Sequence, residues 1–271
     1  MKVAAIQMVS GVDLQANLAQ AAALIAQAAQ AGAELAVLPE YFCLMGQSDQ
    51  DKLALAERPG DGAVQRFLSE QARAHGLWLA GGTLPLATSD AARVHNTSLV
   101  FDPQGACVAR YDKIHLFGFD TGAEHFDEAR TILPGSRPVR FVLASRGGGC
   151  WRVGLSVCYD LRFPELYRAH ARSGCDLLLV PSAFTATTGR AHWEVLLRAR
   201  AIENQAYVLA AAQGGTHENG RRTWGQSMVV GPWGDVLAQQ AQGNAVVLAD
   251  LDPARLREVR GQLPALKHRV L

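Results

Sequence analysis

Residues Trp151-Arg152-Val153-Gly154-Leu155-Ser156-Val157-Cys158-Tyr159-Asp160-Leu161-Arg162-Phe163-Pro164-Glu165 contain a transition between two kinds of secondary structure. The apolar run Trp151–Val157 predicts a buried strand. The pattern from Pro164 to Arg172 predicts a helix, with proline in its first turn. A second strand is predicted at Leu177–Val180. Strand, turn, helix and strand in this order are typical of an α/β protein.

The same alternation extends along the rest of the chain. Asp13 is the predicted N-cap of a helix that runs to about Ala31. A long irregular stretch is expected from Leu116 to Pro138. The other predicted strands are Val3–Met8, Leu35–Leu38, Leu77–Gly81, Thr97–Phe101, Cys107–Tyr111, Tyr207–Ala212, Met228–Val230, Asp235–Gln239 and Val246–Leu248, and the other predicted helices are Ala63–His75, Ala191–Asn204 and Pro253–Gly261. Because hairpins are interleaved and no linker divides the pattern, we expect one domain, residues 1–271, whose sheets are not purely parallel.

Composition narrows the classes of function. The 271 residues carry a formal net charge of +1 with no basic cluster, which argues against nucleic acid as a partner. No apolar run reaches the roughly 18 residues of a membrane span. The N-terminal segment reads as a strand rather than a signal peptide. Five cysteines without a CxxC pair favour a reducing compartment, so a cytoplasmic location is expected.

Cys158 is the first candidate for chemistry. It follows a buried strand and precedes a turn, and side chains at that point lie at the carboxyl edge of the sheet, where α/β proteins bind ligands. Nearby backbone N–H groups would favour a thiolate and could receive an oxyanion. The alternative is a small buried apolar residue, the commonest role of a free cysteine.

Glu40 and Lys113 occupy comparable positions. Glu40 directly follows the strand Leu35–Leu38, so it and Cys158 could lie at the carboxyl ends of neighbouring strands, where a partly desolvated carboxylate suits general-base work. Lys113 ends a hairpin strand and could hold a developing oxyanion. The alternatives are a capping or solvent-facing glutamate and a surface lysine with a buried stem.

Several other residues carry weaker signals. His115 could be the base of a Cys/His pair. The remaining cysteines have no activating pattern and are expected to pack. The histidines lack metal-ligand spacing, so no metal site is predicted. These cysteines are Cys43, Cys107, Cys150 and Cys175.

Three motifs together resemble a known family. Leu38-Pro39-Glu40, Tyr111-Asp112-Lys113-Ile114-His115 and the segment Gly154–Glu165 resemble the Glu–Lys–Cys motifs of the nitrilase (carbon–nitrogen hydrolase) superfamily. The resemblance extends from the first strand to Leu263-Pro264. It implies an α/β fold of four layers, an α–β–β–α sandwich. It also implies homodimers or higher homo-oligomers in which a C-terminal segment, here Leu263–Leu271, crosses to the partner.

The resemblance also implies a mechanism without metal or organic cofactor. Cys158 would attack a carbonyl and form a thioester, and Glu40 would act as the base. Lys113 and the backbone N–H of Tyr159 would hold the oxyanion. Glu128 fits the place of a second glutamate that supports the lysine and the substrate. In such chemistry His115 is a supporting residue rather than the base.

Further segments are similar to the branch of amidases acting on deaminated glutathione. These amidases cut the amide bond that joins 2-oxoglutarate to cysteinylglycine. A fixed cation would bind the keto-acid carboxylate, and Arg162 is the candidate. The alternative is a structural role for Arg162 in an ion pair with Glu165 or another acidic neighbour. Thr187 is a candidate for the pocket wall, or a loop residue. The stretch Phe117–Phe126 differs from the sequence pattern that is common in close relatives at this place. The branch segments are Pro181–Phe184, Thr188-Gly189, His192–Glu203, Trp224–Val230 and Pro232–Gly234.

Three rival functions remain open at the level of sequence. An ω-amidase acting on 2-oxoglutaramate or 2-oxosuccinamate would share the three catalytic residues and release ammonia. A nitrilase would share them as well. A non-catalytic binding module would keep the fold without turnover, although none of the three catalytic positions is substituted.

Overall fold

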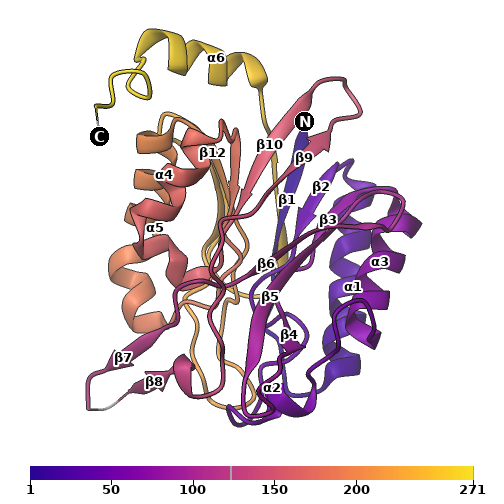
Figure 1. Cartoon of the computed structure of the whole chain (residues 1–271). Helices are drawn as coiled ribbons and strands as arrows, with labels where there is room; N and C mark the ends of the chain where they lie inside the picture. The colour runs from indigo at the N-terminus through magenta and orange to yellow at the C-terminus, as the bar shows by residue number, and fades with distance from the viewer. Residues whose placement is uncertain (123, 271) are drawn as a thin grey trace.

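Residues 1–122 and 124–270 are described by a computed structural model, in which two β-sheets pack face to face and helices cover the outer face of each (Figure 1). This is the α–β–β–α arrangement that the family resemblance implied. The sheets contact each other through β1 and β15 of the first and β12, β13 and β14 of the second, and also through β6 and β9. The two halves of the chain therefore supply one sheet each, except that β15 returns to the first sheet.

The first sheet has seven strands in the order β15-β1-β2-β3-β5-β4, with β6 paired to β5. Its three central strands β1, β2 and β3 are parallel, and the outer pairs are antiparallel. Helices α1 (Leu14–Gln30) and α3 (Ala63–His75) cover its outer face (Figure 1). The strands are β1 (Lys2–Gln7), β2 (Leu35–Val37), β3 (Trp78–Ala80), β4 (Leu84–Ala87), β5 (Val94–Phe101), β6 (Cys107–Asp112) and β15 (Ala245–Asp250).

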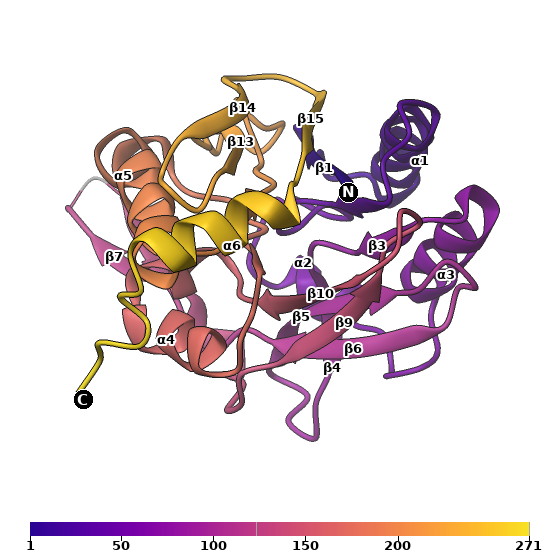
Figure 2. The same cartoon turned by 90° about the horizontal axis from the view of Figure 1, so that it is seen from above.

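The second sheet has six strands in the order β14-β13-β12-β11-β10-β9. Helices α4 (Pro164–Arg172) and α5 (Ala186–Asn204) cover its outer face. Helix α6 (Pro253–Gln262) crosses one end of the sandwich (Figure 2). The strands are β9 (Arg140–Ala144), β10 (Cys150–Leu155), β11 (Leu177–Leu179), β12 (Tyr207–Ala210), β13 (Ser227–Val230) and β14 (Val236–Gln240).

Helix ends follow from local hydrogen bonds. The Asp13 carboxylate accepts the Ala16 N–H at 2.7 Å and so caps α1 as predicted. Thr185 caps α5, which begins at Ala186 rather than at the predicted Ala191. Gly189 explains the difference, because a Cβ there would lie 2.2 Å from the Cβ of Trp224. Because glycine has a low helix propensity, the first turn of α5 was not predicted from the sequence.

Two other expectations about elements were wrong. The stretch Leu116–Pro138, expected to be irregular, contains the hairpin of β7 (Gly118–Asp120) and β8 (His125–Asp127), which projects from the body in Figure 1. Ala123, which lies between these two strands in the sequence, is outside the described residues. Two strands were missed: β4 contains a proline, which an edge strand tolerates, and β9 is a short edge strand.

Apolar side chains fill the two kinds of space between layers. One buried cluster lies between the sheets and under α4 and α5, and a second lies between the first sheet and helices α1 and α3. Two short 3₁₀ turns, η1 (Glu128–Arg130) and η2 (Cys158–Arg162), and a short helix α2 (Asp51–Ala54) lie near one end. Over the described part of the chain, every helix is too short or too polar to cross a membrane.

Candidate active site

The residues singled out in the sequence converge from both sheets. Glu40 follows β2 of the first sheet and Lys113 follows β6 of the same sheet, whereas Cys158 follows β10 of the second. The expectation that Glu40 and Cys158 follow neighbouring strands was therefore wrong. They meet across the interface between the two sheets, and the Ala183 N–H, which follows β11, donates to Glu40 Oε2 at 2.9 Å.

A buried lysine joins two carboxylates. Lys113 Nζ donates to Glu40 Oε1 at 3.0 Å and to Glu128 Oε2 at 2.8 Å. Its side chain is fully buried, and that of Glu40 is 1 % exposed. Buried charges of this kind are tolerated only when they are paired and hydrogen-bonded. The structure thus brings Glu40, Lys113 and Glu128 into one network, as the resemblance implied.

Each carboxylate has further donors that fix its orientation. Asn96 Nδ2 donates to Glu40 Oε1 at 2.9 Å. The Tyr41 hydroxyl donates to Glu128 Oε1 at 2.9 Å, and the Phe117 N–H donates to Glu128 Oε2 at 2.8 Å. Neither Asn96 nor Tyr41 was predicted from the sequence as a member of the site. Asn96 lies within a strand and gave no signal, but Tyr41 directly follows Glu40 and could have been included.

Cys158 occupies an uncommon backbone conformation. Its φ is +49°, in the left-handed region that residues other than glycine rarely adopt. Its N–H donates to the Pro181 carbonyl at 2.9 Å, and the side chain of Asp160 accepts the Val157 N–H at 2.8 Å. Such strain is held only where surrounding contacts determine it, and it occurs often at functional sites.

Asp160 secures the turn after Cys158 and was also missed. It is fully buried and accepts the Tyr111 hydroxyl at 2.6 Å, and its Oδ1 lies 2.7 Å from His115 Nδ1. The His115 ring stacks on Phe163 with 3.7 Å between centroids. His115 therefore supports the turn and does not line the cavity beside Cys158, which agrees with its assignment as a supporting residue.

The charges in the site set its protonation states. Burial alone would lower the pKa of Lys113, but Glu128 and Glu40 outweigh burial and raise that pKa well above its usual value. Burial and the Glu40 carboxylate raise the pKa of the Cys158 thiol, against the opposing effect of Lys113. These effects oppose the stabilisation of a thiolate that nearby N–H groups were expected to give. The raised pKa favours a protonated Cys158 at neutral pH, and Glu40 lies beside it in the same cavity.

Burial also acts on Glu128, where it would raise the pKa of the carboxyl. Lys113 and the donors Phe117 and Tyr41 outweigh burial and lower that pKa below the ordinary glutamate value. Glu128 is consequently ionised at neutral pH and compensates the charge of Lys113.

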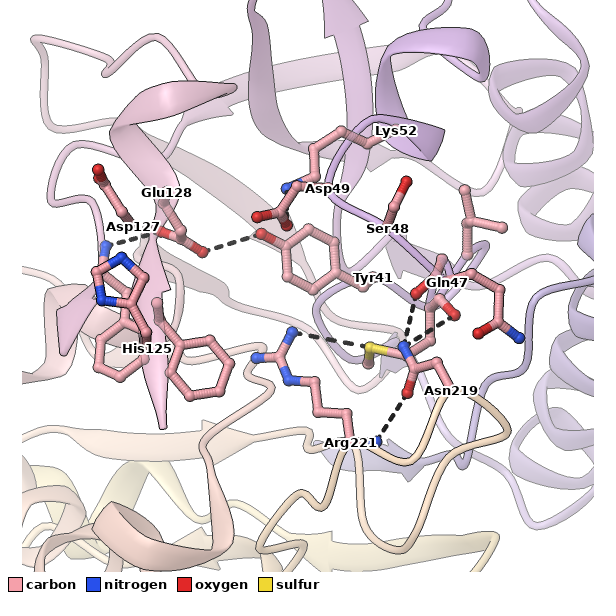
Figure 3. Close-up of a pocket in the computed structure, with 15 residues that line it drawn as sticks. Tyr41, Gln47, Ser48, Asp49, Lys52, His125, Asp127, Glu128, Asn219 and Arg221 are labelled. Carbon is pink, nitrogen blue, oxygen red and sulfur yellow. Dashed lines mark hydrogen bonds and ion pairs between the residues drawn. The ribbon is translucent and has the colours of Figure 1, made fainter. Parts of the chain in front are cut away.

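Two neighbouring cavities lie over this network. The inner cavity is lined by Cys158, Tyr159 and Arg162 and has a free volume of about 10 Å³, room for about one water molecule. The outer cavity has a volume of about 260 Å³, and Figure 3 shows the residues that line it. Phe117, Glu128 and Arg221 line both. Any substrate larger than its reacting group must extend from the inner cavity into the outer one or displace the wall.

Of the predicted substrate-binding residues, Arg162 lines the inner cavity and Thr187 does not. Arg162 lines the inner cavity, stacks over the Tyr159 and Phe184 rings and lies 3.1 Å from His192 Nδ1. Over the described residues it forms no ion pair, so the alternative pairing with Glu165 is not found. Thr187 is exposed, donates to Glu124 at 2.8 Å and does not line the cavity. The wall instead contains Thr185 and Thr188.

The other cysteines are all free within the described chain. Cys43 and Cys175 are buried as expected, and burial raises the pKa of Cys43 to about 12 and that of Cys175 to about 11. Cys107 and Cys150 are exposed, so the expectation that they pack was wrong. Within residues 1–122 and 124–270, no group of three or more His, Cys, Asp or Glu side chains could hold a metal ion.

Comparison with known proteins identifies the family. The model of the carbon-nitrogen hydrolase family matches residues 2–261. The chain belongs to the carbon–nitrogen hydrolase family. A deaminated glutathione amidase from Synechocystis is 42% identical over 270 residues, 98% of this chain and 97% of the relative. The human omega-amidase NIT2 is 39% identical over 254 residues, 93% of this chain and 89% of the relative.

Solved structures of this family agree. The Caenorhabditis elegans NitFhit protein has a TM-score of 0.88 at 39% identity, and the match covers 99% of this chain and 65% of that chain. An amidase from Nesterenkonia sp. AN1, with acrylamide added at its active-site cysteine, has a TM-score of 0.79 at 31% identity, covering 97% and 98%. The chain is therefore an amidase-type carbon–nitrogen hydrolase with the nitrilase-superfamily fold.

Proposed function

We propose that this hydrolase cleaves the amide of deaminated glutathione into 2-oxoglutarate and cysteinylglycine, with Cys158 as the nucleophile. The observation that carries the proposal is the buried network of Glu40, Lys113 and Glu128 against the cavity that Cys158 lines. The names of full-length relatives such as the Synechocystis amidase support the choice of substrate.

Acylation follows from the positions of the charges. The Cys158 sulfur bonds to the amide carbon while its proton passes to Glu40. The resulting oxyanion is held by Lys113 and by the Tyr159 N–H, which has no intrahelical acceptor at the start of η2. The carbon–nitrogen bond then breaks, and the leaving amine takes the proton from Glu40. The product is a thioester on Cys158.

Deacylation uses the same groups in reverse order. A water molecule gives a proton to Glu40 as its oxygen bonds to the thioester carbon. The second oxyanion occupies the same position as the first. The carbon–sulfur bond breaks, the sulfur regains a proton from Glu40, and the keto acid leaves. Glu128 keeps Lys113 charged and in place throughout.

Arg162 is the group proposed to bind the keto-acid carboxylate. It lines the inner cavity beside Cys158, and the aromatic rings of Tyr159 and Phe184 hold its guanidinium. An arginine without an acidic partner among the described residues can grip a carboxylate through two hydrogen bonds. Thr187 is no longer part of this proposal because its side chain lies outside the cavity.

A second candidate activity is that of an ω-amidase on 2-oxoglutaramate. The small inner cavity favours it, because the leaving group would then be ammonia. The 39% identity to human omega-amidase NIT2 also supports it. The acyl half of the substrate and the roles of Glu40, Lys113 and Cys158 are the same in both.

The test compares the two substrates directly. Release of 2-oxoglutarate is followed from deaminated glutathione and from 2-oxoglutaramate, with Cys158→Ala as the control for background hydrolysis. A kcat/KM at least about tenfold higher for deaminated glutathione, about 1.4 kcal/mol in transition-state binding, is expected. A reversed preference would make the protein an ω-amidase, and normal turnover by Cys158→Ala would overturn the mechanism.

We also propose that the chain forms a homodimer or larger homo-oligomer in the cytoplasm. Exposed apolar side chains on α5, Val195 at 69 % and Ile202 at 49 %, with Trp233 at 52 %, support an interface. Free exposed cysteines favour a reducing compartment. The proposed crossing tail Leu263–Leu271 ends in Leu271, which lies outside the described residues. Sedimentation equilibrium at several concentrations tests the assembly, and a monomer throughout would refute it.

A further inference from the structure

The outer cavity has features of a binding site that the reaction steps do not use. It adjoins the inner cavity, since Phe117, Glu128 and Arg221 line both. Its far wall is the segment that follows Tyr41 and includes Met45, which is held in place because Asn219 Nδ2 donates to the Gly46 carbonyl at 2.6 Å. A molecule bound at Cys158 can therefore extend into the outer cavity without leaving the protein surface.

Arg221 is placed at the junction of the two cavities. Figure 3 shows its side chain reaching from the chain beside Asn219 toward Tyr41. Its guanidinium lies over the Phe126 ring at 5.4 Å, and Nη2 donates to the Ala183 carbonyl at 3.2 Å. Nη1 contacts only the sulfur of Met45 at 3.8 Å, and the buried Nε has no hydrogen-bond partner.

Arg221 therefore has no ion-pair partner among the described residues. No carboxylate among residues 1–122 and 124–270 lies within ion-pair distance of it. The nearby Glu128 is already bound by Lys113, Tyr41 and Phe117. The other cation of the outer cavity, Lys52, is paired with Asp49 at 3.0 Å. A partly buried guanidinium with spare donors and no anion favours an anionic ligand.

We propose that the outer cavity binds the amine half of the substrate, a short peptide ending in a carboxylate, and that Arg221 takes that carboxylate. The inference rests on the proposed function, because it assigns the cysteinylglycine side of the scissile amide to this cavity. An extended dipeptide spans about 7 Å. Arg162 and Arg221, both on the inner cavity wall, then bind the two ends of one dianionic substrate.

Substrate discrimination provides the test. Arg221→Gln should lower kcat/KM for deaminated glutathione about 10- to 100-fold, the effect of losing one charged hydrogen-bonding partner. The loss of kcat/KM for 2-oxoglutaramate should be at least about fivefold smaller, because that substrate has no group in the outer cavity. The matched control is Arg222→Gln, which removes an exposed neighbouring arginine outside both cavities and should change neither value.

A second measurement needs no variant. Deaminated glutathione amidated at its glycine carboxyl keeps the length of the substrate and removes the terminal charge. The unmodified enzyme should hydrolyse it about 10- to 100-fold less efficiently than the free acid, and Arg221→Gln should hydrolyse both forms equally well.

The outcomes separate two kinds of failure. A preference of the unmodified enzyme for 2-oxoglutaramate would overturn the proposed function and the inference with it. A preference for deaminated glutathione that persists after amidation would overturn the inference alone. Equal losses on both substrates in Arg221→Gln would also overturn it, because they would place Arg221 in the support of Glu40 through Ala183.

Discussion

At the scale of single residues, Lys113 pairs with two buried carboxylates and is also the proposed oxyanion donor. Lys113→Met leaves two buried carboxylates without their cation, which should cost about 3–5 kcal/mol in the free energy of unfolding. It should also lower kcat about 10²- to 10³-fold if Lys113 holds the oxyanion. The measurements are urea denaturation and steady-state kinetics on 2-oxoglutaramate.

A double variant separates the two roles. Lys113→Met/Glu128→Gln removes one of the carboxylates that lost its partner, so part of the lost stability should return. The activity should stay low because the oxyanion donor is still missing. Recovery of activity together with stability would show that Lys113 acts only by supporting the fold.

The protonation state of Cys158 gives a prediction with a definite sign. Because burial and Glu40 raise the pKa of its thiol, the proton should remain bound at neutral pH and leave only above about 8.5, the value of a free cysteine. The difference in thiolate absorbance near 240 nm between the unmodified protein and Cys158→Ala, followed from pH 6 to 10, measures this. A thiolate signal from Cys158 at pH 7 would contradict the mechanism.

The sequence was informative about residues that lie at strand ends within recognisable motifs. Glu40, Lys113, Cys158 and Glu128 were placed together by resemblance, and the structure brings them together. Asn96 and Arg221 could not be found, because one lies in mid-strand and the other in a loop without a pattern. Their proximity to the site depends on sheet packing, which local sequence does not encode.

At the scale of elements, strand β10 and helix α4 touch through a glycine. A Cβ at Gly154 would lie 2.7 Å from Cγ of His170, whose Nε2 is 2.9 Å from the Leu155 carbonyl. Gly154→Ala should therefore push α4 from the sheet and lower the free energy of unfolding by about 1–3 kcal/mol. Gly147→Ala, whose Cβ meets only Ser145 Oγ at 4.0 Å, is the matched control.

Denaturant unfolding of both variants tests this contact. Equal stability of Gly154→Ala and Gly147→Ala would mean that the helix moves without cost. A loss of activity larger than the loss of stability would indicate that the strand–turn–helix unit around Cys158 had shifted as well.

Elements with a strong apolar period were the easiest to predict. Strands such as β10 and helices such as α4 lie close to their predicted bounds, whereas the hairpin of β7 and β8 was missed. Each of its strands has only 3 residues, with one partly buried phenylalanine between exposed neighbours, which is too short for a period of two to be recognised. The pairing of strands into two sheets also came from the family resemblance, because local periodicity does not specify long-range partners.

At the scale of the whole molecule, stability should fall in mild acid. Burial lowers the pKa of His170 and His217 below the usual value, so both are neutral in the folded protein. The unfolded chain takes up these protons below about pH 6.5, and folding then loses up to about 1.4 kcal/mol per pH unit for each histidine. Above that pH neither histidine contributes.

Unfolding free energies between pH 7.5 and 5 measure this dependence. His170→Gln should show a shallower slope, and the exposed His268→Gln should keep the slope of the unmodified protein. A slope that is unchanged by His170→Gln would assign the acid sensitivity to other groups. The depressed pKa of Glu128 adds its own loss only below about pH 4.5, outside this range.

The hydrogen bond from the Ala183 N–H to Glu40 makes the position of the general base depend on how the two sheets pack. Because it spans the interlayer spacing, the general base is aligned by atoms from one sheet while its side chain grows from the other. A slip of the layers by a fraction of an ångström misaligns the reacting groups although every strand and helix persists. The catalytic rate therefore depends strongly on the relative position of the two sheets. Denaturant concentrations too low to unfold the protein should already lower its activity.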